Sequence, residues 1–291
     1  MHGEKSSSLA VMISIAIVGG LWYGYAQNLL GVRAYVEKNY LPKQPKNAYD
    51  LAYDPNDTYA ELRNMKDLEL PATSNKDIVV KHLAYTLSYN EDHEQANWVA
   101  YRLESKNLDG KTKRNSDFRP DPAIQQRSAL PDDYKASGYD RGHLAPSGDF
   151  KFSAQANSET FLMSNISPQV HAFNEGVWRA LEEALRDWVR KDKIYYIVTG
   201  PVLQGKLKKI GKQNKVSVPD YYFKIVLCLE KEPKAIAFLM KNEASDAPLK
   251  SFVTSIDKIE ELTGIDFFPA LPDELEDKLE SNIIVTQWFK K

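Results

Sequence analysis

The sequence YDRGHLAP, residues 139–146, places an acid, an arginine, a glycine and a histidine at four consecutive positions. The packing of a helix or a strand does not require that combination, whereas a site that handles phosphate does. His143 is a candidate general base, because an imidazole takes up and releases a proton near neutral pH. Arg141 offers a fork of donors that matches phosphate oxygens, and Gly142 would let both side chains face one target. Asp140 would orient a ring or hold the arginine. On four residues alone, a polar loop with a hydrogen-bonded histidine is an equally good interpretation.

Two segments downstream add further polar residues at set spacing. Residues 164–169 read SNISPQ, and residues 174–182 read NEGVWRALE. With these motifs the chain resembles the DNA/RNA non-specific endonucleases of the ββα-metal class, the group that includes endonuclease G. That family carries DRGH, then N-I-x-P-Q, then N-x(3)-W-x(2)-L-E, and all three motifs occur here in that order. The resemblance runs from about residue 76 to the C-terminus. It implies a mixed α+β fold of the ββα-metal nuclease type, in which helices flank a central antiparallel sheet.

The helix that carries the last motif would also carry a metal ion. In the family, an asparagine at the position of Asn174 binds a divalent metal through its side-chain oxygen. A glutamate at the position of Glu182 holds a metal-bound water. Magnesium fits such a site because it prefers oxygen ligands and keeps several waters of its own, and manganese is the alternative ion. Without the resemblance, Asn174 is an ordinary helix N-cap, and Glu182 and Arg186 are an i,i+4 surface ion pair.

The resemblance assigns the remaining roles as well. The catalytic residues that it implies are His143, Arg141, Glu182 and Asn165. The substrate-binding residues that it implies are Arg114, Arg141, Arg186 and Asp140. The expected reaction is hydrolysis of phosphodiester bonds in DNA and/or RNA, in which the histidine takes a proton from the attacking water and the metal stabilises the developing charge. Because phosphate contacts carry no base sequence information, we expect little base preference and strong sensitivity to salt.

Residue patterns outside the motifs predict a sheet with few long helices. Runs rich in β-branched and aromatic residues predict strands at 78–80, 84–89, 97–103, 194–199, 222–229 and 234–240. Apolar residues at helical spacing predict helices at 174–190, 251–262 and 273–281. Residues 204–216 read as a lysine-rich loop. Cys228, the only cysteine, falls in a predicted strand, so the chain has neither an intrachain disulfide nor a zinc site built from cysteines.

The first thirty residues differ from the rest of the chain. Residues 9–26, LAVMISIAIVGGLWYGYA, form an apolar run without a charge and just reach the length needed to cross a bilayer. Trp22, Tyr23 and Tyr25 stand at its far end, where interfacial aromatic residues are expected. The aromatic cluster favours an uncleaved signal anchor, and a cleaved signal peptide ending near Ala26 is the alternative.

These patterns divide the chain into three parts. We expect a signal anchor or signal peptide at 1–30, a proline-containing tether at 31–75 and the endonuclease domain at 76–291. We also expect an N-terminal hydrophobic helix, contact with the membrane through it, and export of the catalytic domain. That domain would be anchored outside the cytoplasm, or secreted or periplasmic if the segment is cleaved. The family further implies that the domain could form a homodimer.

Composition leaves two rival functions open. With 291 residues and a net charge of −2, the chain as a whole is not a basic nucleic-acid binder, so binding would need a local basic groove. The first rival is a non-catalytic, surface-anchored nucleic-acid-binding protein for DNA uptake. It would need the arginines but not His143, Asn174 or Glu182. The second is a metal-dependent hydrolase of another ester, against which only the family resemblance speaks.

Overall fold

The structure, a computed structural model, describes residues 59–125, 128–230 and 232–289. The expected anchor and N-terminal hydrophobic helix therefore lie outside the described residues. Within the described part of the chain, no helix combines the length and the apolar composition that a membrane crossing requires.

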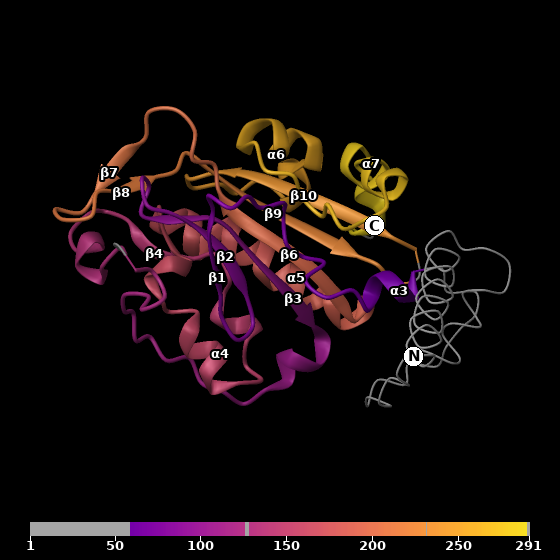
Figure 1. Cartoon of the computed structure of the whole chain (residues 1–291), viewed down its shortest axis with the longest axis horizontal. Helices are drawn as coiled ribbons and strands as arrows, with labels where there is room; N and C mark the ends of the chain where they lie inside the picture. Colours follow the sequence, from indigo (N-terminus) through magenta and orange to yellow (C-terminus); the bar gives the residue numbers. More distant parts are fainter. Residues whose placement is uncertain (1–58, 126–127, 231, 290–291) are drawn as a thin grey trace, which may run out of the picture. The chain divides into compact units, whose positions relative to one another are not determined.

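A sheet of seven antiparallel strands forms the centre of the domain (Figure 1). The strand order is β1-β2-β3-β6-β9-β10-β11, and every neighbouring pair is antiparallel. The strands are β1 (Ile78–Lys81), β2 (Thr86–Asn90), β3 (Gln95–Glu104), β6 (Ile194–Pro201), β9 (Tyr221–Cys228), β10 (Lys234–Lys241) and β11 (Val253–Thr254). The predicted strands are confirmed to within a few residues, and so is a mixed α+β fold with a central antiparallel sheet.

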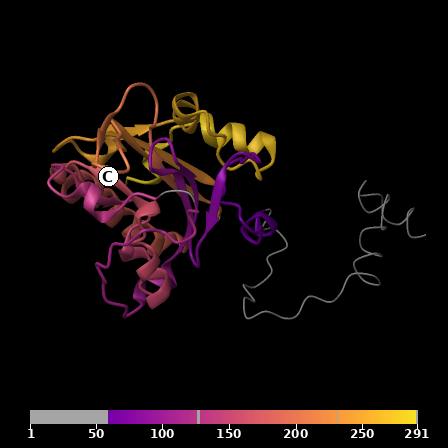
Figure 2. The same ribbon diagram turned by 60° about the vertical axis from the view of Figure 1, so that its left-hand side comes forward.

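Helices cover both faces of this sheet (Figures 1 and 2). The helix α5 (Arg179–Asp192) packs on one face, and α6 (Ile256–Thr263) and α7 (Asp273–Ser281) pack on the other. The alternation of side chains along a strand explains how β6 serves both layers. Tyr195 and Ile197 join the core under α5, whereas Tyr196 and Val198 join the core under α6 and α7.

Part of the segment expected to be a tether packs onto the domain. The short helix α3 (Ala60–Arg63) precedes Leu68, whose side chain is fully buried in the core under α6 and α7. The hydroxyl of Tyr196 donates a hydrogen bond of 3.0 Å to the carbonyl of Arg63. One compact unit spans Asp57–Lys291 and thus begins before residue 76. The division into anchor, tether and domain stays a prediction.

The remaining elements are short. They comprise the strands β4 (Asp140–His143), β5 (Ile166–Gln169), β7 (Lys208–Ile210) and β8 (Val216–Val218), the helix α4 (Ala154–Glu159), the wide turn η5 (Phe173–Trp178), and the 3₁₀ turns η1 (Ser105–Asp109), η2 (Pro131–Tyr134), η3 (Ser147–Asp149), η4 (Met163–Asn165), η6 (Leu249–Phe252) and η7 (Val285–Gln287). The strands β7 and β8 form a hairpin inside the segment that we expected to be a loop.

Two helices start later than the apolar spacing predicts. The first begins at Arg179 rather than at residue 174, because Gly176 lies outside the helical region with φ −99° and ψ −114°. The second begins at Ile256, because the Ser255 side chain caps it by accepting a hydrogen bond from the Lys258 amide. The third helix, α7, spans residues 273–281 as expected.

Candidate active site

The hairpin β4–β5 brings the first two sequence motifs together. Its register pairs Gly142 with Ser167 and His143 with Ile166. Because side chains alternate along a strand, Arg141 and His143 point to the same side of β4. Gly142 faces the other way, where an added Cβ would overlap the side chain of Gln169. The alternation therefore turns the side chains of Arg141 and His143 toward the same side of the strand. On the other side, the absence of a Cβ at Gly142 leaves room for the side chain of Gln169.

His143 lines a polar cavity and is only 8% exposed. Its ring centroid is 4.8 Å from that of Phe161 and 5.6 Å from that of Phe118. Burial, together with the positive charge of Arg114, lowers the pKa of His143 to about 3. The imidazole is therefore neutral at pH 7. Its Nε2 atom is buried and has no hydrogen-bond partner among the described residues, an arrangement that is costly to stability and concentrates at functional sites.

Asn174 stands in the wide turn η5 and does not cap the helix α5. Its Nδ2 atom donates a hydrogen bond of 3.0 Å to Oδ2 of Asp140, which also lies 2.8 Å from Nδ1 of His171. This bond uses the amide nitrogen and leaves the side-chain oxygen available to a cation. The structure thus places Asp140 as a holder of Asn174, outside the walls of the polar cavity.

Glu182 projects from the first turn of α5 and lines the cavity. Arg186 lines it one turn further on. Its ion-pair partner is Asp149, at 2.9 Å. The surface ion pair with Glu182, four residues earlier, is therefore not the contact that fixes this arginine. Gly148 borders this guanidinium, and an added Cβ there would lie 2.9 Å from its Nη1 atom. The arginine is thereby fixed with part of its fork exposed to the cavity.

Lys224 stands behind Glu182, and the sequence reasoning missed it. The side chain rises from β9, is completely buried, and places Nζ 4.7 Å from the ring centroid of Trp178. Its nearest acceptor is the carbonyl of Leu144, at 3.4 Å. Burial lowers the pKa of Lys224 to about 8, and the charges of Glu182 and Asp149 act against that shift.

Burial also raises the pKa of Glu182, to about 7, and the charges of Lys224 and Arg186 oppose the rise. The two buried groups therefore stabilise each other's charge. A sequence signal did exist for the lysine, because Tyr222–Cys228 is otherwise an apolar run and a charge seldom sits in a buried strand.

The cavity has a volume of about 340 Å³ and is rich in positive charge. Five cationic side chains line it against two carboxylates; the cations are Arg114, Arg141, Lys151, Arg179 and Arg186, and the carboxylates are Glu175 and Glu182. The chain as a whole has a net charge of −2, so this balance is local. Such a surface attracts a polyanion.

The structure brings six of the expected site residues to this one cavity. They are Arg114, Arg141, His143, Asn174, Glu182 and Arg186. Asn165 is not among them, because it is fully buried behind the hairpin. Its Oδ1 accepts from the amide of Ala145 at 2.9 Å, and its Nδ2 donates to the carbonyls of Ala145 and Thr160. It clamps the backbone that follows the histidine. Lys151 is a cavity residue that we did not expect, and an isolated lysine in a polar loop gave no signal.

The donor set of the cavity fits an oxygen-preferring divalent cation. The free amide oxygen of Asn174 and the carboxylate of Glu182 are both hard oxygen donors on the same cavity wall. The arginines that line the same cavity would bind an anion. A cavity with one neutral imidazole, hard oxygen donors and several guanidinium groups is suited to a metal-assisted reaction at a phosphate group.

Known proteins share this combination of fold and residues. Residues 69–274 match the family model described as DNA/RNA non-specific endonuclease. The chain is 36% identical over 212 residues to a nuclease from Nostoc sp., across 68% of this chain and 76% of that protein. It is 34% identical over 202 residues to human mitochondrial endonuclease G, across 64% of this chain and 68% of that protein. Danio rerio mitochondrial nuclease EXOG is 36% identical over 205 residues, and the match spans 60% of its length, less than two thirds.

A solved structure agrees with these relatives. The fold superimposes on a chain from the crystal structure of the EndoG/EndoGI complex with a TM-score of 0.65 and 28% identity, covering 71% of this chain and 90% of that one. The chain therefore belongs to the DNA/RNA non-specific endonuclease family. It is an enzyme of that family.

Proposed function

We propose that the protein is a metal-dependent endonuclease that hydrolyses phosphodiester bonds in DNA and/or RNA with little base preference. The observation that carries the proposal is the cavity in which His143, Asn174 and Glu182 meet four arginines. Strand β4 supplies Arg141 and His143, the turn η5 supplies Asn174, and α5 supplies Glu182 and Arg186. The hairpin β4–β5 and α5 together make up the ββα unit. A nucleic acid would be attracted by the cationic walls.

In this mechanism His143 is the general base. Its neutral ring takes a proton from a water, which attacks the phosphorus. A pKa of about 3 in the free protein is low for this task. The negative charge of a bound phosphate opposes the burial effect and the charge of Arg114, and so raises the pKa toward the range in which a base works best. The walls of Phe118 and Phe161 limit the access of bulk water to the ring.

The cationic side chains hold the phosphate in place. Arg141 projects from the same side of β4 as the base, and Arg186 is fixed by its ion pair with Asp149. Arg114 reaches the cavity from the loop before η2 and lies with Cζ 5.3 Å from the Phe161 ring centroid. Donors that are already ordered stabilise charge that develops on the non-bridging oxygens without further reorganisation.

Asn174 and Glu182 would hold the metal, the first directly and the second through a water. Asp140 keeps the amide turned so that its oxygen faces the cavity. Magnesium, or manganese in its place, supplies charge stabilisation at the phosphate and the leaving oxygen when bound. Lys224 and Arg186 favour the ionised form of Glu182, which is the form that accepts hydrogen bonds from water.

We also propose that the domain works outside the cytoplasm and is attached through residues 1–30. The apolar run at 9–26 supports this proposal. Loss of export in a fusion to a reporter enzyme after deletion of residues 1–30 would test it, and unchanged export would contradict it. A homodimer stays a prediction, which sedimentation of the purified protein can check.

The test of the catalytic proposal uses the compact unit Asp57–Lys291. Plasmid and single-stranded RNA are incubated with the wild type and with His143→Ala, each with magnesium, with manganese and with a chelator. We expect metal-dependent cleavage that disappears in the variant. Salt-sensitive binding without cleavage under any of these conditions would contradict the proposal. Cleavage of other phosphate esters at a higher kcat/KM than nucleic acid would favour the second rival.

A further inference from the structure

A second cavity adjoins the catalytic one. It has a volume of about 440 Å³, and Arg141 and Asn174 line both cavities. Three aromatic side chains, Phe118, Tyr134 and Tyr139, contribute to its other walls. The mechanism above uses Phe118 only as a wall beside His143 and gives neither tyrosine a role.

The tyrosines of this cavity are held in place before any ligand arrives. The hydroxyl of Tyr134, which is 5% exposed, donates a hydrogen bond to the carbonyl of Ile166 at 3.3 Å. Tyr139 is half-buried, and its hydroxyl accepts a hydrogen bond of 3.3 Å from Nζ of Lys208. The same Nζ lies 4.9 Å from the centroid of the Tyr139 ring. An aromatic surface that is already ordered loses little conformational entropy when a flat ligand stacks on it.

The arginine between the two cavities connects them chemically. The guanidinium of Arg141 lies 4.2 Å from the ring centroid of Phe118. A phosphate bound by this arginine would therefore stand at the boundary of the second cavity. The nucleotide that follows such a phosphate along the strand has to pass the mouth of that cavity.

The charges around the second cavity fit a nucleotide as well. Lys135 is exposed and lines it, and Lys208 lies against its Tyr139 wall. These lysines are placed to contact a backbone phosphate. The cavity also carries two carboxylates, Asp132, which is exposed, and Asp140, which already accepts a hydrogen bond from Asn174. Aromatic side chains that stack on bases, combined with flanking cations, characterise sites for unpaired nucleic acid.

We propose that this second cavity is a nucleobase subsite, in which the base next to the scissile phosphate stacks on the ring of Tyr139 that Lys208 holds in place. The inference rests on the proposed endonuclease function and adds a contact to the substrate that phosphate binding alone does not supply. Any base could occupy the subsite, because every base offers a flat face for stacking. The subsite thus raises affinity without adding sequence preference.

The experiment uses the full-length protein and an oligonucleotide with one hydrolysable phosphodiester, whose other linkages are methylphosphonates. Three versions carry all bases, an abasic sugar on the 5′ side of the scissile linkage, or an abasic sugar on the 3′ side. We expect one of the two abasic versions to raise KM of the wild type by roughly fivefold or more, which corresponds to the loss of one stacked base. Tyr139→Ala should raise KM for the intact version by a similar factor and should no longer distinguish it from that abasic version.

Two variants serve as controls. Tyr139→Phe keeps the ring and should preserve the sensitivity to the abasic sugar, although it loses the hydrogen bond to Lys208. Tyr221→Ala removes a tyrosine that is 41% exposed on β9 and lines neither cavity, so it should behave as the wild type. Equal KM values for the three oligonucleotides with the wild type, or an undiminished abasic effect in Tyr139→Ala, would overturn the subsite while leaving the endonuclease function intact. No cleavage of any version by the wild type would contradict both.

A binding measurement covers the case in which Tyr139→Ala does not fold. The same oligonucleotide, with 2-aminopurine at the sensitive position and no metal present, is titrated with the wild type and with Tyr139→Leu. Stacking quenches the fluorescence of 2-aminopurine, so we expect quenching with the wild type and much less with the variant. Equal quenching by both proteins would overturn the proposal.

Discussion

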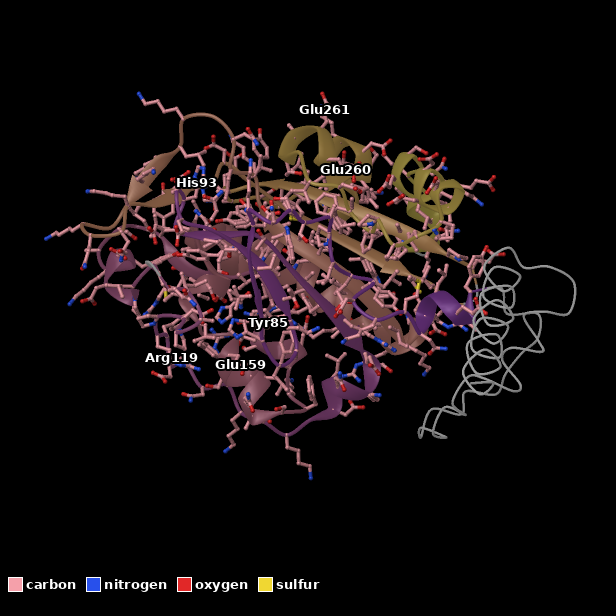
Figure 3. The ribbon with its side chains drawn as sticks, viewed as in Figure 1. Tyr85, His93, Arg119, Glu159, Glu260 and Glu261 are labelled. Carbon is pink, nitrogen blue, oxygen red and sulfur yellow. The ribbon has the colours of Figure 1, made fainter. Side chains whose placement is uncertain are left out.

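The carboxylate of Glu182 and a cluster of three acidic residues lie on opposite faces of the central sheet and differ in the charges that surround them. At α5, Glu182 has Lys224 and Arg186 nearby, and both oppose the rise in its pKa. At α6 and α7, one carboxylate oxygen from each of Asp257, Glu260 and Glu280 lies within 4.8 Å of the other two. Figure 3 marks Glu260 on α6, across the sheet from α5 in Figure 1.

The second group has no such compensation. Burial raises the pKa of Glu280 to about 8, and the four charged groups that add most to the rise are all carboxylates, Glu260 and Glu276 foremost. Its Oε1 atom is buried without a hydrogen-bond partner among the described residues. Burial raises the pKa of Glu260 as well, and a side-chain hydrogen bond from Glu280 opposes that rise only in part, so the group shares a proton.

The comparison shows that the number of carboxylates does not define the catalytic site. The α6–α7 group has three acidic residues close together and relieves their repulsion by holding a proton. The catalytic cavity uses one carboxylate and one neutral amide, and its buried charges are balanced by Lys224 and Arg186. A site that must bind both a cation and an anionic substrate requires that balance. An excess of carboxylates would repel the substrate, and an excess of cationic side chains would repel the metal ion.

The largest effect is expected at the base. His143→Ala removes the proton acceptor and should lower kcat on plasmid DNA by about 100-fold to 10,000-fold, the usual contribution of general base catalysis. The measurement is the rate at saturating substrate and metal. Glu280→Gln is the matched substitution in the other region and should leave kcat within about twofold of the wild type, since it lies across the sheet. A kcat for His143→Ala close to the wild-type value would refute the role of the base.

The next effect is expected at the buried counter-ion. Lys224→Met removes the cation that lowers the pKa of Glu182 most strongly, so that pKa should rise above its value of about 7. More of the carboxyl is then protonated at neutral pH, and raising the pH should restore its ionised form. Because a pKa of about 7 leaves half of the carboxyl ionised at pH 7, activity at that pH should fall by about fivefold for the first unit of the rise and by about tenfold for each further unit. The deficit should shrink toward pH 9.

The pH profile of kcat/KM for the wild type, Lys224→Met and Lys224→Arg measures this effect. The arginine keeps the charge and should recover part of the activity at pH 7. Lys234→Met is the control, because this lysine also lies over a tryptophan, 4.5 Å from the ring centroid of Trp288, but far from the cavity. A deficit in Lys224→Met that is the same at pH 7 and pH 9 would indicate a purely structural role.

A smaller effect is expected for the dependence of binding on salt. The cationic cavity should make the logarithm of the affinity for DNA fall linearly with the logarithm of salt concentration. Arg114→Ala removes one phosphate contact and should reduce that slope by about one. Arg190→Ala provides a control, since this arginine pairs with Asp109 and does not line the cavity. Equal slopes for Arg114→Ala and the wild type would remove Arg114 from the interface.

The smallest effect is expected for stability at the acidic group. The folded-state pKa of Glu280, about 8, exceeds the ordinary value of 4.5, so the folded state holds this proton more tightly than the unfolded state does. The stabilisation is fully present below pH 4.5 and is lost as the pH rises through 8. Glu280→Gln resembles the protonated form at every pH. Its Tm should exceed that of the wild type by at least a few degrees at pH 9, since the whole shift of the pKa sets an upper limit of about 5 kcal/mol, and should equal it at pH 4.5.

The sequence predicted the core of the fold better than the elements of the site. The strands β6, β9 and β10 were found because long runs of β-branched and aromatic residues have few alternatives to a buried strand. The hairpin β4–β5 was not found as strands, because each has four residues and contains a glycine or a proline. The backbone pairing of those short strands depends on contacts that are distant in sequence, such as the clamp formed by Asn165.

Motifs gave the residues of the cavity, and geometry gave their supports. The six side chains that meet there were expected from the family resemblance. Their spacing in the sequence alone did not predict that they would meet. The function of Asp140 as the holder of Asn174, and of Lys224 as a counter-ion, depends on neighbours 34 and more residues away. No local sequence pattern predicts such neighbours. A lysine within an apolar strand nevertheless indicates a buried charge, and a buried charge requires a partner of opposite sign.

The most direct test of the central claim is a measurement that identifies the residues to which the metal ion binds. Binding of Mn²⁺ to the full-length protein is titrated by calorimetry for the wild type, Asn174→Ala and Glu280→Gln at pH 7. We expect Asn174→Ala to weaken binding by about tenfold or more and Glu280→Gln to leave it unchanged, because the balanced cavity accepts the cation and the α6–α7 carboxylates keep their proton. Binding that survives Asn174→Ala and disappears in Glu280→Gln would place the metal at the acidic group and contradict the account.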